Sequence, residues 1–179
     1  RDRVLHHALL NIVEPLLDKR FIYDSYACRQ GKGVHQAVDR YQIWANRYRY
    51  ALKMDIWQYF PSIDHLLLKD TLRQRLKDKP VLALFDQLID TAPPVKRPPI
   101  WYAGDDLFTP GERRTGIPIG NLTSQFLANL YLDDFDHFLK EQYRLPAYLR
   151  YLDDILVLGD DTHQVHALPQ FLPACLTPY

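Results

Sequence analysis

The segment 147–159 constrains the fold most strongly, because it sets two adjacent acidic residues between two apolar runs. Alternation and β-propensity predict a hairpin whose strands span about 147–151 and 155–158. The tip of a hairpin can expose Asp153 and Asp154, which a buried strand could not hold as free charges. Carboxylates this close repel each other unless a cation lies between them. An ordinary acidic turn explains the segment about equally well, because Asp is common in turns.

A third carboxylate lies in a second strand-like segment, far away in the sequence. Residues 50–56 alternate, so that Leu52 and Met54 fall on one face and Lys53 and Asp55 on the other. Asp55 therefore projects from the end of a strand, on the face opposite the core. This third acidic group favours a shared cation site over an ordinary turn.

Apolar residues at helical spacing predict helices around these strands. The expected helices cover Val4–Leu17, a segment from about Val34, Leu66–Leu76, a segment opened by Pro80, and a long helix that follows the loop Gly116–Gln125 and runs to about Tyr143. In the long helix, five apolar residues are expected to face the core: Phe126, Leu130, Phe135, Phe138 and Leu139. Asp133, Asp134 and Asp136 are expected on its solvated side.

Charge is unevenly spread along a chain whose net charge is zero. Residues 1–53 carry ten Lys and Arg against five Asp and Glu, whereas residues 111–179 carry five against nine. This distribution suits a protein that holds a polyanion with one part and metal ions with another, although ordinary variation also produces it.

The two cysteines, Cys28 and Cys175, have no CxxC spacing, which argues against a zinc site and a disulfide framework. A reducing cytoplasm is therefore predicted. The sequence contains no signal peptide and no apolar run of membrane length, so no membrane partner is expected. The abrupt start at Arg1 and the absence of a closing element at Tyr179 suggest a fragment or trimmed chain.

Basic residues in the first third are candidates for contact with phosphate. Arg29 and Lys32 lie among glycines just before a helix, where backbone N–H groups and positive charge can hold phosphate. Three arginines at positions 40, 47 and 49 alternate with aromatic residues, a pattern that suits nucleic acid. A flexible basic loop and amphipathic packing are the simpler explanations.

Three motifs now identify a family. Asp55-Ile-Trp-Gln-Tyr-Phe60, the loop Gly116–Gln125 with its helix, and Tyr151-Leu-Asp-Asp154 resemble, in order and spacing, the polymerase motifs of reverse transcriptases. The upstream segment Ser25–Gly33 resembles the fingers motif of bacterial members. The resemblance covers nearly the whole chain.

The resemblance implies an α+β fold of the fingers–palm type. It places an antiparallel palm sheet against helices at Leu66–Leu76 and Asn121–Tyr143. Residues 1–50 would form partial fingers, and residues 51–179 a palm with an interleaved fingers segment at about 92–115. The thumb would be missing.

The implied reaction is RNA-directed DNA synthesis, in which deoxynucleotides are added to the 3′ end of a primer. The implied partners are an RNA template, a DNA or RNA primer and dNTPs, with a basic accessory protein as a further candidate. Asp55, Asp153 and Asp154 would be catalytic and, together with the carbonyl of Ile56, would bind two Mg²⁺ ions, for which Mn²⁺ could substitute. Two such ions about 4 Å apart would contact the attacking and leaving oxygens, and oxygen ligands suit Mg²⁺.

The resemblance also implies nucleotide-binding roles for Phe60, Ile119, Gly120 and Gln125, and triphosphate or template contacts for Arg29 and Lys32. Phe60 occupies the position of the family's sugar gate, where a ring would exclude a ribose 2′-OH. Ile119 and Gln125 depart from the common pattern, which has Gln and Pro there. This form resembles the reverse transcriptases of diversity-generating retroelements, which copy adenines with frequent errors. The hypothesis is that Ile119 packs on the incoming nucleotide without hydrogen bonding to it, which loosens base selection.

Two alternatives remain open. The chain could come from another bacterial reverse transcriptase, of a group II intron, a retron or an antiphage system. It could also be a catalytically inactive relative that binds RNA or a partner, although the presence of all three carboxylates argues against decay.

Overall fold

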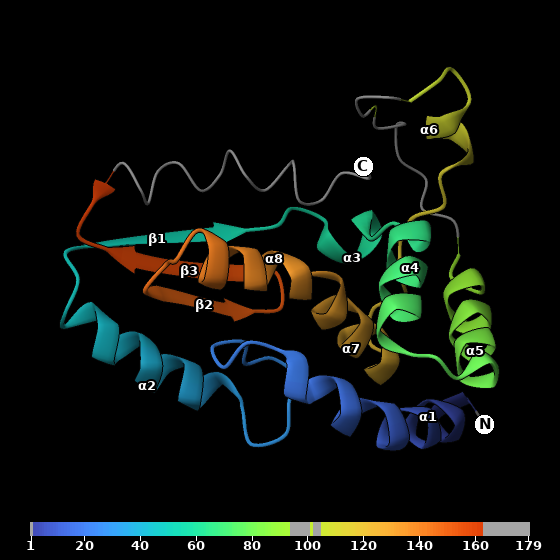
Figure 1. Cartoon of the computed structure of the whole chain (residues 1–179), viewed down its shortest axis with the longest axis horizontal. Helices are drawn as coiled ribbons and strands as arrows, with labels where there is room; N and C mark the ends of the chain where they lie inside the picture. Colours follow the sequence, from blue (N-terminus) through green and yellow to red (C-terminus); the bar gives the residue numbers. More distant parts are fainter. Residues whose placement is uncertain (1, 94–100, 102–104, 163–179) are drawn as a thin grey trace. The chain divides into compact units, whose positions relative to one another are not determined.

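The computed structural model describes residues 2–93, 101 and 105–162, which combine helices with a small antiparallel sheet (Figure 1). This arrangement confirms the predicted α+β class. The elements in chain order are α1 Asp2–Leu17, the 3₁₀ turn η1 Asp18–Arg20, α2 Val34–Ala45, β1 Tyr50–Asp55, α3 Tyr59–Ser62, α4 His65–Arg75, α5 Lys79–Asp90, α6 Thr109–Glu112, α7 Leu122–Tyr131, α8 Asp133–His137, the π-helical turn η2 Phe138–Gln142, β2 Ala147–Tyr151 and β3 Asp154–Gly159.

The described residues divide into two compact units. The helical unit comprises the chain up to Leu17 and residues Gln58–Tyr131, and the sheet unit comprises Asp18–Trp57 and the chain from Leu132 onward. The division into fingers and palm at residue 50 stays a prediction. Part of the predicted fingers segment 92–115, and the chain beyond residue 162 where a thumb would begin, lie outside the described residues.

The sheet has the strand order β1-β3-β2, and both neighbouring pairs are antiparallel. The predicted hairpin is β2–β3, and its strands begin and end within about a residue of the expected positions. One face of this sheet is buried in a core that includes Tyr148, Ile155 and Val157, each with no exposed surface. Helix α2 packs on the other face, where Ala37 and Trp44 join a buried cluster with strand residues such as Leu149.

The helices of the helical unit begin at side-chain caps. The Asp64 carboxylate accepts hydrogen bonds from the N–H groups of Leu66 (2.7 Å) and Leu67 (3.2 Å), which fixes the start of α4. Asp78 caps α5 in the same way, with Pro80 in the first turn as expected. In the part of the chain that is described, no helix is long and apolar enough to cross a membrane.

The long helix predicted up to about Tyr143 is correct in its extent but not in its continuity, because it is interrupted at Leu132. Leu132 departs from helical geometry (φ −97°, ψ 4°), and the chain restarts as the short helix α8 and then winds into the π-helical turn η2. The predicted solvated position of the acidic residues is wrong for Asp133 and Asp136, which are 1% and 0% exposed, and right for Asp134. Asp136 is fully buried, and the cation of Arg150 compensates the cost of burying its charge.

Candidate active site

The register of the sheet brings two of the three predicted catalytic carboxylates together. Asp55, the last residue of β1, pairs directly with Asp154, the first residue of β3. Side chains of directly opposed residues point to the same face of an antiparallel pair and lie close together. Like charges in such a position destabilise the pair, so this point of the sheet is a natural place for a cation.

The third carboxylate, Asp153, lies in the turn that joins β2 to β3. The turn begins at Leu152, which has a positive φ of 56°, a conformation that a bulky residue adopts only under strain. The N–H group of Ile56 donates a hydrogen bond to the Asp153 carbonyl oxygen (3.3 Å). The backbone that follows Asp55 is therefore tied directly to the backbone of Asp153.

Burial and the closeness of the three carboxylates shift the pKa values of residues at the site. Burial raises the pKa of Asp153 above its ordinary value, and the charges of Asp55 and Asp154 raise it further. Lys53, two residues before Asp55, forms an ion pair with Asp154 (2.8 Å). The hydrogen bond to Asp154 and the charge of that carboxylate raise the pKa of Lys53. Lys53 thus supplies positive charge to the carboxylate cluster.

The chemistry of the site fits a hard divalent cation. Carboxylate oxygens and backbone carbonyls are the ligands that Mg²⁺ and Mn²⁺ accept. Within the described ranges, no three His, Cys, Asp or Glu side chains are already arranged as a metal-binding cluster, and Asp154 is directed to Lys53 instead. The ligand roles of Asp55, Ile56, Asp153 and Asp154 stay predictions.

A cavity of about 340 Å³ lies beside these residues, between α2 and the carboxylate face of the sheet. Lys53 and Asp154 are its charged lining residues, and the remaining lining residues are apolar or aromatic: Val34, Ala37, Val38, Tyr41, Leu149, Tyr151 and Leu156. The face that carries the carboxylates is thus partly covered by α2, with open volume left next to Asp154.

The predicted nucleotide-binding residues Phe60, Ile119, Gly120 and Gln125 all belong to the helical unit. The structure brings their two segments together, because the Ile117 N–H group donates to the Phe60 carbonyl oxygen (3.1 Å). Ile119 is 77% exposed, and Gly120 has a φ of 95°, which a side chain would strain. Such a loop can present its backbone closely to a ligand, and the nucleotide-binding roles stay predictions.

His65 is a residue of this region that the sequence did not single out. Its side chain is buried, and its Nε2 atom lies 2.7 Å from the Gly116 carbonyl oxygen. The His65 N–H group also donates to the Arg114 carbonyl oxygen (3.0 Å). The first residue of α4 therefore fixes the base of the loop that carries Ile119 and Gly120. Its position directly after a capping Asp was the available sequence signal.

The two predicted phosphate-binding residues contact the protein itself. The Arg29 guanidinium donates to the Asp18 carboxylate (2.6 Å) and to the carbonyl oxygens of Ile22 (2.7 Å) and Ser25 (2.8 Å). Lys32 donates to the Tyr23 carbonyl oxygen (2.8 Å), and burial lowers the pKa of its ammonium group. These contacts favour a structural role for Arg29, and a triphosphate or template contact by either residue stays a prediction.

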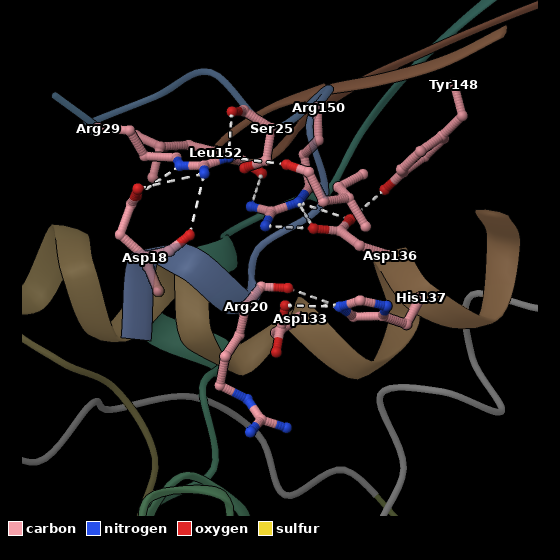
Figure 2. A network of polar contacts seen from close by, with 12 residues as sticks. Asp18, Arg20, Ser25, Arg29, Asp133, Asp136, His137, Tyr148, Arg150 and Leu152 are labelled. Atoms are coloured by element: carbon pink, nitrogen blue, oxygen red, sulfur yellow. Dashed lines mark hydrogen bonds and ion pairs between the residues drawn. The ribbon is translucent and has the colours of Figure 1, made fainter. Parts of the chain in front are cut away.

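A buried ion pair behind the hairpin is the second feature that sequence reasoning missed. Figure 2 shows Arg150 of β2 facing Asp136 of α8, and the shortest contact between them is 2.6 Å. Both side chains are 0% exposed. An arginine at a core-facing position of an apolar strand was the signal, because such a residue needs a buried anion.

Comparison with known proteins agrees with the geometry. The profile of the family described as Reverse transcriptase (RNA-dependent DNA polymerase) matches residues 1–178. Protein YkfC of Escherichia coli K12 is 28% identical over 80% of this chain, and a Saccharomyces cerevisiae protein named for intron 2 of COX1/OXI3 is 24% identical over 80%. Nuclear intron maturase 1, mitochondrial, of Arabidopsis thaliana is 29% identical over 48%. The chain spans 36%, 16% and 12% of the length of these relatives, respectively. With the family profile covering almost every residue, the chain belongs to the reverse transcriptase family.

Proposed function

We propose that this chain carries the catalytic centre of an RNA-directed DNA polymerase, which adds deoxynucleotides to a primer on an RNA template. The observation that supports this most directly is the pairing of Asp55 with Asp154 across β1 and β3. Two residues remote in the sequence thereby lie at one point of the sheet, beside the turn that carries Asp153. Family membership makes nucleotidyl transfer the expected chemistry for such a site.

In this proposal, the protein's own residues position the reactants. Asp55 and Asp153 would hold the cations, Asp154 would support them, and the Ile56 carbonyl would be a further ligand. When bound, a pair of Mg²⁺ ions would neutralise charge on the attacking 3′ oxygen and the leaving phosphate. In-line placement of primer and triphosphate would then account for most of the catalysis.

The helical unit would select the nucleotide. We assign Phe60 as the sugar gate, and Ile119, Gly120 and Gln125 as the loop that contacts the incoming nucleotide. The exposure of Ile119 and the positive φ of Gly120 support a loop that is shaped for contact rather than for packing. The Phe60→Ala variant should accept ribonucleotides more readily than the wild type does.

Primer extension tests the proposed activity. The complete natural chain that carries this sequence should extend oligo(dT) on poly(rA) with dTTP and Mg²⁺. The Asp153→Ala variant should be inactive while keeping the thermal stability of the wild type. Equal activity of the two proteins would refute the assigned catalytic centre. Inactivity of both, in Mg²⁺ and in Mn²⁺, would refute the proposed activity and favour an RNA-binding relative without catalysis.

The type of retroelement is a finer proposal. The Ile119 and Gln125 form of the loop supports an error-prone enzyme of a diversity-generating retroelement. The Ile119→Gln variant should then misincorporate less opposite adenine in a fidelity assay. Unchanged misincorporation would remove this idea.

Intron-associated reverse transcription is the second candidate, because two of the relatives are named for introns. An enzyme of that class should bind its own intron RNA more tightly than an unrelated RNA of equal length. Binding of both RNAs with equal affinity would argue against this candidate.

A further inference from the structure

Arg150 lies on the face of the sheet opposite the carboxylates. It pairs with the fully buried Ile155, whereas the next residue, Tyr151, pairs with Asp154. Because side chains alternate along a strand, the Arg150 side chain points into the core behind the site. Any influence on the site must therefore pass through the backbone of the hairpin.

Most of the guanidinium is engaged by one carboxylate. Arg150 Nε lies 2.8 Å and 2.9 Å from the two Asp136 oxygens, and Nη2 lies 2.6 Å from one of them. The Tyr148 hydroxyl donates to the same carboxylate at 2.5 Å. Such two-pronged pairing fixes the plane of the guanidinium. Arg150 is thereby held as a rigid donor inside the core.

A third nitrogen of this rigid group reaches the catalytic turn. Arg150 Nη1 donates to the carbonyl oxygen of Leu152 at 3.1 Å (Figure 2). Leu152 is the residue with the positive φ, so its peptide needs external support to keep that conformation. The next carbonyl, that of Asp153, accepts the N–H group of Ile56. Both carbonyls that flank the Asp153 side chain are thus anchored, one from the core and one from β1.

The backbone of Arg150 is anchored as well. Its N–H group donates to the Asp24 carbonyl oxygen (3.0 Å), and its carbonyl oxygen accepts the N–H group of Tyr26 (3.0 Å). The segment that makes these bonds is held in turn by Arg29 through the Ser25 carbonyl oxygen. The donor that supports the turn therefore has little freedom to move.

We propose that Arg150 is a positioning residue that holds the Leu152–Asp153 turn, and with it the Asp153 carboxylate, in the geometry for metal binding. A buried ion pair is a weak source of stability compared with apolar residues of similar size. We therefore expect the ion pair to contribute mainly by holding the geometry of the Leu152–Asp153 turn, rather than by stabilising the fold. The expected loss of polymerase activity rests on the proposed function. The expected loosening of the Leu152–Asp153 turn does not.

The test separates positioning from stability. The triple variant Arg150→Met, Asp136→Leu, Tyr148→Phe replaces the whole buried polar group by apolar side chains, and should fold with a melting temperature near that of the wild type. It should nevertheless exchange the amides of residues 152–154 faster and bind Mn²⁺ about 10- to 100-fold more weakly, as loss of an outer support of a metal site does. In primer extension kcat should fall by a similar factor, with the KM for primer–template unchanged.

Two further variants make the outcome decisive. Arg150→Lys keeps the charge, but an ammonium group cannot hydrogen bond to the Asp136 carboxylate and the Leu152 carbonyl oxygen in the same geometry. This variant should therefore weaken Mn²⁺ binding as well. Arg113→Met removes a cation that faces Asp105 and Asp64 in the helical unit, and should lower stability without changing Mn²⁺ affinity. Wild-type exchange and Mn²⁺ affinity in the triple variant, or equal weakening by Arg113→Met, would overturn the proposal. If the wild type itself fails to extend primers, the proposed function fails, while amide exchange at 152–154 still tests the role of Arg150.

Discussion

A single lysine sets the charge balance around Asp154. Lys53 and Asp154 are 64% and 42% exposed, so water screens their ion pair and it contributes little to folding. The same positive charge stands where a divalent cation would have to approach Asp154. Lys53 would therefore compete with a metal ion for the Asp154 carboxylate.

Replacing Lys53 by Met should strengthen Mn²⁺ binding severalfold, because a repulsive charge near the cation is removed. The melting temperature should stay almost unchanged. Electron paramagnetic resonance of free Mn²⁺ would measure the affinity. Lys69→Met, which breaks an ion pair of similar length between Lys69 of α4 and Asp90 of α5, is the control and should have no effect on Mn²⁺. Unchanged or weaker binding in Lys53→Met would contradict this prediction.

His65 makes folding sensitive to acid. Burial, and to a lesser extent the charge of Arg114, lowers its pKa below the ordinary 6.5, and the hydrogen bond to Gly116 offsets only part of this. Below pH 6.5, His65 binds a proton in the unfolded chain but stays neutral in the folded chain until its lowered pKa is reached. The free energy of unfolding should therefore fall as the pH decreases through this range. His65→Gln keeps a donor near Gly116 without titrating, and should flatten this fall in chemical denaturation curves.

His137 provides the control, because its shift has the opposite sign. Burial alone would lower its pKa, but hydrogen bonds to Glu141 and to the Arg20 carbonyl, together with the charge of Asp133, outweigh burial and raise it. Its contribution to stability is complete below pH 6.5 and is lost as the pH rises through the raised pKa. His137→Gln should therefore change the alkaline side of the profile. An acid limb that is identical in His65→Gln and wild type would refute the role of His65.

At the scale of elements, the strands and the extent of the long helix were predictable, whereas its interruption at Leu132 was not. Strand β1 and the hairpin follow from local alternation, and their ends are marked by the acidic residues themselves. The burial of Asp136 goes with its contact to Arg150, 14 positions away, which no periodic pattern encodes. The pairing of Asp55 with Asp154 could be expected from the family motifs, whereas Lys53, His65 and Arg150 depend on tertiary contacts.

A strained residue that can be improved lies two positions after the π-helical turn η2. Arg144 is exposed and has a φ of 57°. The next N–H group, of Leu145, donates to the Leu139 carbonyl oxygen (2.9 Å). Glycine adopts this conformation without strain. Arg144→Gly should stabilise the protein by about 0.5–1 kcal/mol, measured by urea denaturation. Arg144→Ala, which keeps the strain, should not stabilise, and a stabilising effect of Ala would contradict the explanation.

At the scale of the whole molecule, the net charge is zero although the first third of the chain is basic. Arg47 and Arg49 are exposed near the end of α2, and each lies over a neighbouring tyrosine ring. Cations beside aromatic rings suit single-stranded nucleic acid, which they bind by phosphate contact and stacking.

RNA affinity should therefore fall steeply with salt despite the neutral composition. The double variant Arg47→Gln, Arg49→Gln should reduce the slope of log affinity against log salt by about one to two, measured by fluorescence anisotropy. Lys77→Gln and Lys79→Gln together, at the start of α5, form the control and should leave the slope unchanged. Equal slopes for wild type and the arginine variant would exclude this surface from binding.

The strand order β1-β3-β2 also dictates when the site can exist during protein synthesis. The hairpin β2–β3 closes locally and quickly, but β1 leaves the ribosome about a hundred residues before the strand that it must join. Asp55 therefore cannot pair with Asp154 until the whole hairpin has been translated. A nascent chain stalled before residue 154 should be unable to form the carboxylate pair, so the centre arises in one late step.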